Sequence, residues 1–202
     1  VHINIHKTFA TPHGGGGPGS GPIAVTKELE RFLPVPTVER AGDRYYLDFD
    51  RPDSIGKIRS FWGNSAVLVR AYAYILMMGR DGLEETADIS VLNANYLAKK
   101  LSQVRGLELP FADRLRKHEF VLSAARIARE TGVTAAHLSK RLLDFGIHAP
   151  TIYFPLIVDE AMMIEPTETV SKQELDETAM AFLKASAEAY TNPDVVKDAP
   201  RN

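Results

Sequence analysis

The sequence predicts a chain of mixed α/β class that ends in a compact α+β unit. Three observations support this prediction. Two stretches between residues 61 and 103 carry apolar residues at the spacing of one helix face. The chain after Gly106 instead alternates short strand-like and helix-like segments. The first residues combine a strand-like opening with a loop that is rich in glycine.

The composition limits the classes of function that the chain can serve. Hydrophobic residues make up 45% of its 202 residues and charged residues 25%, which is typical of a globular protein with a buried core. The net charge of −2 gives no reason to expect nucleic acid or an anionic membrane as a partner. Because cysteine is absent, disulfides, thiolate catalysis and sulfur-ligated metals are excluded. With no secretory signal and no apolar run near the ~18 residues of a membrane span, we expect a cytoplasmic protein.

The opening segment, Val1–Ile5, alternates apolar and polar residues as a strand does. A strand that starts at the first residue, without methionine, suggests a fragment of a longer chain, and a removed tag or processed leader is the alternative. We expect the other strands of its sheet to be missing. Residues 1–36 should then be poorly protected or recruited into another chain, which favours an oligomer.

The region from residue 10 to residue 104 predicts loops followed by two helices. Residues 14–22 are almost entirely glycine and proline and cannot form a helix or a regular strand. Residues 33–54 are loop-like, with one possible short strand at Tyr45–Phe49. A helix is predicted from Phe61 to Met78, where Gly79 stops it, and a second from Asp81 to Gln103. Together these helices form a connector.

The C-terminal part predicts short strands and capped helices. Strands are predicted at His118–Ser123, Thr151–Val158 and Ala161–Ile164. Thr134 is a helix N-cap, and Gly146 ends that helix after Phe145. Ser171 and Glu174 form a capping box that opens an amphipathic helix, and the tail after Asn192 is short helix or coil.

Lys7 is the first candidate for chemistry. A lysine can form a Schiff base with an aldehyde cofactor if its ammonium group loses a proton easily, and burial or nearby positive charge promotes this. Lys7 stands at the end of an apolar strand and leads into the glycine loop, which suits such a role. Most lysines are solvated surface residues, however, so its position alone does not select it.

The glycine loop and the histidines leave several interpretations open. The glycines could bring backbone N–H groups close to a phosphate, or the loop could be a flexible surface segment, because it matches neither common phosphate-binding motif. His2 and His6 could bind zinc, but on a straight strand they are about 13 Å apart. We therefore predict no metal. His148 follows a helix end, where a partly buried histidine bonding a free carbonyl is the alternative to a functional role.

The order of these segments resembles the P-protein family, the decarboxylating glycine dehydrogenases of the glycine cleavage system. The resemblance covers nearly the whole chain, and Tyr153–Val158 resembles the second subunit of the two-subunit form. The matching segments are His6–Phe9, Pro12–Gly19, Ser54–Gly56, Gly63–Asn64, Arg70–Ile75, Val91–Leu97, His118–Val121, Lys140–Asp144, Gly146–Thr151 and Glu165–Thr169.

This resemblance implies the aspartate-aminotransferase-like fold of enzymes that depend on pyridoxal phosphate. Residues 1–60 would be the end of the large cofactor-binding domain, residues 61–104 the helical connector, and residues 105–202 the small α+β domain. The carboxylate that pairs with the pyridine nitrogen, the residue that stacks on the ring and most phosphate ligands would precede Val1.

The resemblance also implies the site and its activity. Lys7 would hold pyridoxal phosphate and act as the catalytic residue, with His6 and Thr8 beside the cofactor. The substrate pocket would be lined by His13, Gly14, Gly15, Gly16, Gly17, Asn64, His148 and Thr151. The implied activity is decarboxylation of glycine with aminomethyl transfer to the lipoyl arm of H-protein, with the first P-protein subunit as a further partner. The alternatives are another amino-acid decarboxylase of the same fold and an inactive structural fragment.

Overall fold

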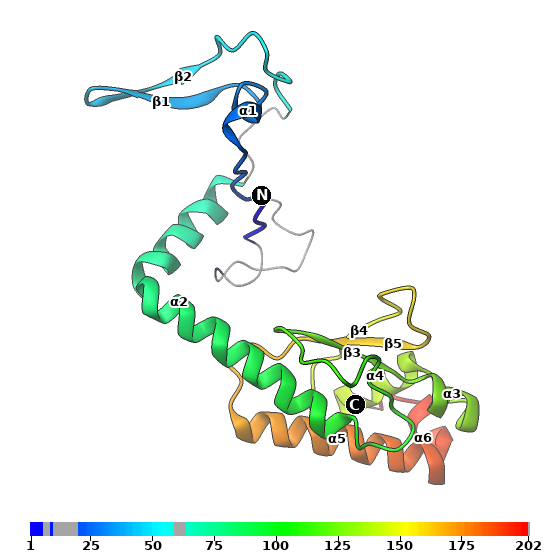
Figure 1. The fold of residues 1–202 in the computed structure, drawn as a ribbon. Helices are drawn as coiled ribbons and strands as arrows, with labels where there is room; N and C mark the ends of the chain where they lie inside the picture. Colours follow the sequence, from blue (N-terminus) through cyan, green and yellow to red (C-terminus); the bar gives the residue numbers. More distant parts are fainter. Residues whose placement is uncertain (6–8, 10–19, 59–63, 202) are drawn as a thin grey trace. The chain divides into compact units, whose positions relative to one another are not determined.

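The computed structural model describes residues 1–5, 9, 20–58 and 64–201. These residues form two compact units, Val1–Asp81 and Gly82–Asn202 (Figure 1). The division falls inside the predicted connector, because the chain after Asp81 packs with the C-terminal unit. The assignment of three parts with boundaries after residues 60 and 104 stays a prediction for the complete protein.

The N-terminal unit contains a short helix, α1 (Lys27–Glu30), and a β-hairpin. The hairpin pairs β1 (Thr37–Ala41) with β2 (Arg44–Asp48) antiparallel, so that Thr37 faces Asp48. The predicted strand near Tyr45–Phe49 is confirmed, but the prediction of loop for its partner β1 is wrong. The local signal for this turn is Gly42, whose φ of 62° suits the first central position of a two-residue hairpin turn.

The opening segment is extended, but its partner lies within the chain. Backbone N–H groups of Ile3 and Ile5 donate to the carbonyls of Pro22 and Ser20 at 3.2 Å, and His2 forms a β-bridge with Ile23. The antiparallel partner is therefore the segment that follows the glycine loop. We expected every other strand of this sheet to be missing. This expectation is wrong for one neighbour, because residues 20–24 of the same chain pair with the opening segment.

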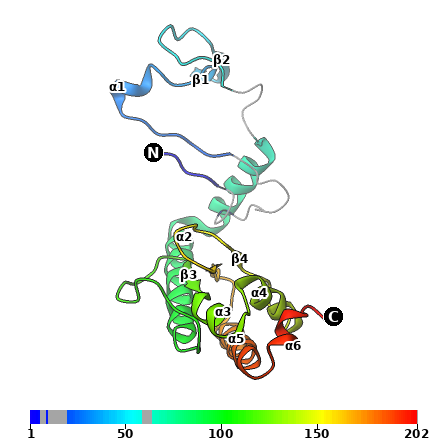
Figure 2. The same ribbon diagram turned by 90° about the vertical axis from the view of Figure 1, so that its right-hand side faces the viewer.

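Helix α2 (Ser65–Leu101) corresponds to the two predicted helices (Figure 2). The predicted start at residues 61–63 lies outside the described residues, and the helix ends at Leu101, two residues before the predicted end. The two helices meet at Gly79, whose φ of 63° and ψ of −170° are not helical. This confirms the predicted break, because a residue with positive φ at this position favours glycine. The helix before the break belongs to the N-terminal unit, and almost all of the helix after it belongs to the C-terminal unit.

The C-terminal unit contains a three-stranded antiparallel sheet in the order β3–β5–β4. Its strands are β3 (Phe120–Ser123), β4 (Thr151–Ile152) and β5 (Ala161–Ile164). The strands predicted over His118–Ser123 and Ala161–Ile164 are confirmed. The strand predicted over Thr151–Val158 is wrong beyond Ile152, because Tyr153 has a φ of 58° and Pro155 has no N–H to donate.

Four helices complete this unit, and two of them have the predicted caps. They are α3 (Ala125–Thr131), α4 (Ala135–Asp144), α5 (Lys172–Thr191) and α6 (Pro193–Lys197). Thr134 caps α4, and Ser171 with Glu174 forms the capping box of α5. Helix α3 follows β3 directly and was not predicted.

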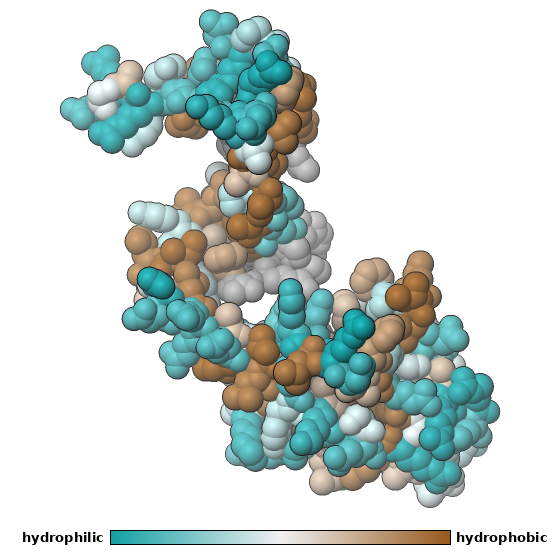
Figure 3. Space-filling view, viewed as in Figure 1, coloured by the Kyte–Doolittle hydropathy of each residue, from teal (hydrophilic) through white to brown (hydrophobic). Residues whose placement is uncertain are grey.

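The core of the C-terminal unit joins the end of α2, the sheet and the later helices. Its largest fully buried side chains include Leu97, Leu101, Leu122, Ile127, Leu138 and Leu142. The N-terminal unit buries far less: among its described residues Ile5, Val67 and Ala71 form one small cluster. Figure 3 shows brown apolar side chains at the surface. In the hairpin, Val38, Tyr45 and Tyr46 are exposed.

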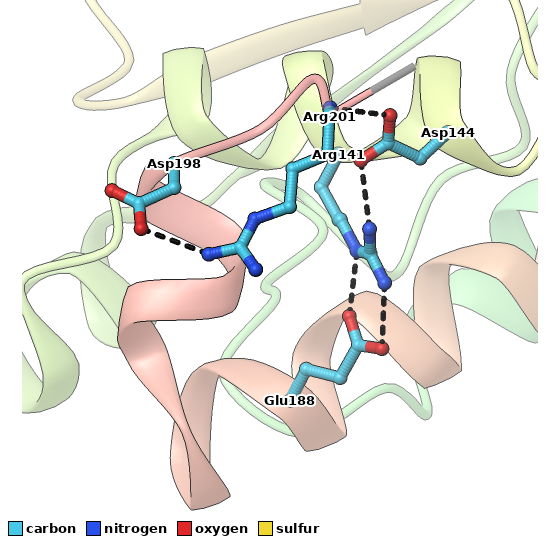
Figure 4. Close-up of polar contacts among 5 residues, drawn as sticks. All are labelled: Arg141, Asp144, Glu188, Asp198 and Arg201. Atoms are coloured by element: carbon cyan, nitrogen blue, oxygen red, sulfur yellow. Dashed lines mark hydrogen bonds and ion pairs between the residues drawn. The ribbon is translucent and has the colours of Figure 1, made fainter.

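Arg141 ties α4 to α5 beside this core (Figure 4). Its guanidinium donates to Glu188 at 2.8 and 2.9 Å and to Asp144 at 2.7 Å. Donation to Glu188 raises the pKa of this guanidinium, partial burial opposes the shift, and donation to Asp144 adds to it. Asp144 also accepts the backbone N–H of Arg201, so the network fastens the C-terminal tail.

Within the described part of the chain, no helix combines the length and the apolar character needed to cross a membrane.

Candidate functional site

The predicted cofactor residues and most of the predicted substrate-pocket residues lie outside the part of the chain that the structure describes. The cofactor residues are His6, Lys7 and Thr8, and the pocket residues are His13, Gly14, Gly15, Gly16 and Gly17. Their roles therefore stay predictions. Ile5 and Phe9, two positions before and two positions after Lys7, are described.

Ile5 and Phe9, two residues before and after Lys7, both pack on the first half of α2. Ile5 is 5% exposed and is buried with Val67 and Ala71, and Phe9 packs against the same cluster. The ring of Phe9 also meets the ring of Tyr74 edge to face, with centroids 6.4 Å apart and planes at 85°. Positions 67, 71 and 74 share one face of a helix, so α2 offers one apolar surface to both flanks of Lys7.

Asn64 begins α2. Its backbone carbonyl and its Oδ1 both accept the N–H of Val67, at 3.1 and 3.4 Å, which is the position of a helix cap. The residue is exposed. Asn64 therefore has a local role as the cap of α2, the helix against which Ile5 and Phe9 pack. Its place in the substrate pocket stays a prediction.

His148 and Thr151 lie at one end of the sheet in the C-terminal unit. Thr151 begins β4, and its partner in the register is Met163 of β5. His118 precedes β3 at the same sheet end, where Glu165 follows β5. His118 Nε2 lies 3.6 Å from Glu165 Oε1. The antiparallel register therefore brings the segment with two predicted residues to the same sheet end as a His118–Glu165 contact that was not predicted.

His148 is exposed in this unit, so the alternative of a partly buried histidine is wrong. Among the described residues, no hydrogen bond or strand pairing joins His148 to Thr151. The two come from one short segment, and the register of β4 places that segment beside the end of β5.

Two asparagines of α2 position the segments around this sheet end. The Nδ2 group of Asn93, which is 8% exposed, donates to the carbonyls of Thr167 and Val170 at 2.9 and 3.0 Å. The side chain of Asn95 bonds the backbone N–H and carbonyl of Arg116, both at 2.8 Å. The sequence does contain a signal for these two residues: they are asparagines within an apolar helical pattern, and a buried amide needs hydrogen-bond partners.

A charged cluster joins α2 to α5. Asp176 accepts from Tyr96 at 2.6 Å, from Lys100 at 2.7 Å and from Lys172 at 2.9 Å. Donation from Lys100, then from Tyr96 and Lys172, holds the pKa of the Asp176 carboxyl well below its usual range. The same contact with Asp176 raises the pKa of Lys100. The cluster is a structural link between helices and includes none of the predicted site residues.

Among residues 1–5, 9, 20–58 and 64–201, no three or more histidine, aspartate or glutamate side chains are grouped as metal ligands. His2 is described, whereas His6 and His13 are not.

Comparisons with known proteins agree along the whole chain. Residues 86–200 match the family model described as "Glycine dehydrogenase, C-terminal domain". A "Probable glycine dehydrogenase (decarboxylating) subunit 2" from Pyrococcus abyssi is 63% identical over 204 residues, which cover 100% of this chain and 40% of the relative. Proteins of the same name from Thermococcus gammatolerans and Caldanaerobacter subterraneus are 62% and 56% identical, again over 100% of this chain. The chain spans about two fifths of the length of these relatives.

A solved structure shares the fold. It is described as a crystal structure of glycine decarboxylase (P-protein) of the glycine cleavage system in inhibitor-bound form. The match has a TM-score of 0.72 and 23% identity, and it covers 87% of this chain and 41% of that chain. The expected fold is confirmed by this match.

Proposed function

Because this chain belongs to the glycine dehydrogenase C-terminal domain family, we propose that the protein of which it is a part decarboxylates glycine. The aminomethyl group that remains is transferred to the lipoyl arm of H-protein. The observation that carries this proposal is the 56–63% identity over the whole chain to proteins named glycine dehydrogenase (decarboxylating) subunit 2. The chain spans 40% of such a relative, so the activity is that of the complete protein.

The cofactor in this proposal is pyridoxal phosphate, held by Lys7. When bound, it supplies an acceptor for the electrons that are released as carbon dioxide leaves. One observation on described neighbours supports this group: Ile5 and Phe9, two positions before and after Lys7, both pack on an apolar surface of α2. An apolar environment at the lysine would lower the pKa of its amine and so favour the bond to an aldehyde cofactor.

The chain's own residues would bind the reactants and move protons. The Lys7 amine gives up its proton to bind the cofactor and then serves as a proton donor or acceptor at the substrate carbon. His6 and Thr8 help to fix the cofactor beside it. His13, the glycines Gly14 to Gly17 and Asn64 line the pocket and the entrance for the lipoyl arm.

The C-terminal unit contributes His148 and Thr151 from the small domain. Two features support this placement. His148 is exposed and available to a ligand, and Thr151 begins a strand at the sheet end where His118 and Glu165 pair. The three parts of the chain in this proposal are the end of the large domain (residues 1–60), the connector (61–104) and the small domain (105–202).

The partners follow from the name of the relatives. A second subunit implies a first one, so the proposed enzyme is an oligomer of this protein with the first P-protein subunit, working in the cytoplasm. The proposed substrate is glycine, and the proposed acceptor is lipoylated H-protein.

The test is an assay of glycine-dependent release of carbon dioxide by the complete protein with its first subunit, pyridoxal phosphate and lipoylated H-protein. We expect release with glycine and an aminomethyl group on the lipoyl arm. Omission of H-protein and replacement of glycine by larger amino acids are the controls. Release from another amino acid, with no transfer to H-protein, would establish the alternative, a different decarboxylase of this fold.

A further inference from the structure

The connection between β4 and β5, residues 153–160, exposes large apolar side chains. Phe154 is 55% exposed, and Leu156 and Ile157 are each 87% exposed. Figure 1 shows this connection projecting from the sheet, and Figure 3 shows apolar colour at the same place. Several large apolar side chains that are exposed side by side mark a surface that other groups cover, because their removal from water is favourable.

Both ends of this connection have left-handed backbone at residues other than glycine. Tyr153 has a φ of 58°, and Glu160 has a φ of 49°. Such a backbone costs free energy at a residue with a side chain, and it persists only where the surrounding contacts hold it. At the first end, the N–H of Tyr153 donates to the carbonyl of Ala161 at 2.9 Å.

The second end is anchored in the core of the C-terminal unit. Glu160 Oε2 accepts the backbone N–H of Ala135, where α4 begins, at 2.6 Å. The carbonyl of Glu160 accepts the N–H of Ala124 at 3.0 Å, and the carbonyl of Asp159 accepts the Ser123 hydroxyl at 2.7 Å. Ser123, Ala124 and Ala135 are all buried. The base of the connection is therefore fixed, while its tip is presented to the outside of the unit.

The chemistry of the tip and the size of the relatives indicate what covers it. Aliphatic side chains on a preformed backbone are typical of permanent interfaces, which are more apolar than transient ones and resemble a domain core. This chain covers 40% of the Pyrococcus abyssi relative, so most of the length of that relative lies outside the match. The corresponding part of the complete protein is joined covalently to this chain, and it therefore competes at a high effective concentration against separate partners.

We propose that residues 154–157 form a docking tip that packs against an apolar surface in the part of the complete protein that this chain does not contain. The anchored base suits this role, because a tip that already has its bound conformation loses little conformational entropy when it docks. This inference goes beyond the proposed function, since it concerns packing and requires neither cofactor nor glycine.

The first experiment is photo-cross-linking of the complete protein, prepared without its first subunit and without cofactor. Leu156 is replaced by the photoreactive residue benzoylphenylalanine, and mass spectrometry maps the peptide to which it becomes bound. Leu115, which is 90% exposed in another loop of the same unit, is replaced in the same way as the control. We expect position 156 to cross-link within one protein molecule, to a peptide outside these 202 residues, and position 115 not to react with that peptide.

The second experiment is thermal unfolding of the complete protein. The double change Leu156→Ser with Ile157→Ser should lower the unfolding temperature by about 3 °C or more, because docking buries both side chains. Leu115→Ser should change it by less than about 1 °C, as a surface substitution does. Glu160→Ala removes the acceptor for Ala135 and should reduce the cross-link from position 156, whereas Glu160→Gln keeps an acceptor oxygen and should preserve it.

The cross-linked peptide decides between the possible partners. Attachment between two molecules would identify a second copy as the partner, and attachment only after the first subunit is added would identify that subunit. Either result would overturn the proposal, and so would attachment to no peptide or to a peptide within these 202 residues. If the serine variants do not fold, the cross-link in the otherwise unchanged protein still decides. Because neither experiment measures turnover, the proposed function is tested separately.

Discussion

The two units of this chain differ in how completely they bury their own apolar residues. The C-terminal unit surrounds Leu101, Leu122, Leu142 and their neighbours with sheet and helices, and each of these three is 0% exposed. The described N-terminal unit buries one cluster around Val67, while Tyr45 of its hairpin is 70% exposed. The difference teaches that the C-terminal unit completes its own apolar core. The N-terminal unit, which contains the proposed cofactor lysine, has apolar surface left for other contacts.

The largest effect expected belongs to the N-terminal unit. Lys7→Ala in the complete protein should remove the absorbance of the lysine-bound cofactor and nearly all glycine turnover, because the proposed bond to the cofactor is made by the Lys7 amine. Thermal unfolding of the variant is the control for loss of the fold. If the variant kept the turnover of the parent protein, Lys7 would not be the catalytic residue, and the N-terminal unit would not contain the cofactor lysine.

The second prediction concerns the core of the C-terminal unit. Leu142→Ala should lower the free energy of unfolding by about 3 kcal/mol, because it leaves a cavity in a fully buried site. Urea unfolding of the 202-residue chain measures this. The control is Leu47→Ala in the hairpin, where the side chain is 44% exposed and the change should stay within about 0.5 kcal/mol. Equal losses would show that the hairpin is packed as firmly as the core.

The third prediction concerns the link between α4 and α5. Arg141→Ala should cost about 2 kcal/mol, because Asp144, whose side chain is 5% exposed, and Glu188 lose their guanidinium partner. Arg126→Ala is the control, since the Arg126–Glu130 pair is exposed at 52% and 40% and such pairs contribute at most about 1 kcal/mol. A loss no greater than that of the control would mean that the buried network adds nothing.

The smallest effect is a dependence on pH. The folded pKa of Asp176 is depressed by Lys100, Tyr96 and Lys172, so its contribution to stability is fully present above the unfolded pKa of about 3.9. That contribution is lost as the pH falls below about 4 toward the depressed value. Asp176→Asn should therefore flatten the decline of stability in acid, whereas Glu177→Gln on the same helix is the control. Identical acid profiles for the parent and Asp176→Asn would contradict this assignment.

The sequence predicted best what local rules decide. Thr134 and Ser171 begin their helices through capping boxes, and Gly146, with a φ of 74°, follows the end of α4, so both helices were predicted with their caps. Gly79 marked the break in α2 for the same reason. These features depend on residues a few positions apart, and sequence spacing displays them directly.

The errors occurred where distant segments decide the structure. Residues 153–158 have the apolar character of a strand, but β4 ends at Ile152 because the next residue, Tyr153, has a φ of 58°. The pairing of the opening segment with residues 20–24 spans the glycine loop, and sequence spacing carries no record of it. In the candidate site, Asn93 and the His118–Glu165 pair were missed because their meaning lies in contacts between segments more than 40 residues apart.

The most direct test of the central claim is to reduce the complete protein with borohydride in the presence of pyridoxal phosphate and to map the modified peptide by mass spectrometry. Reduction fixes the cofactor to the amine that holds it. We predict one modified site, Lys7, in the peptide that joins Ile5 to Phe9, and no modification in Lys7→Ala. Stoichiometric cofactor on any other lysine, with Lys7 unmodified, would contradict the account.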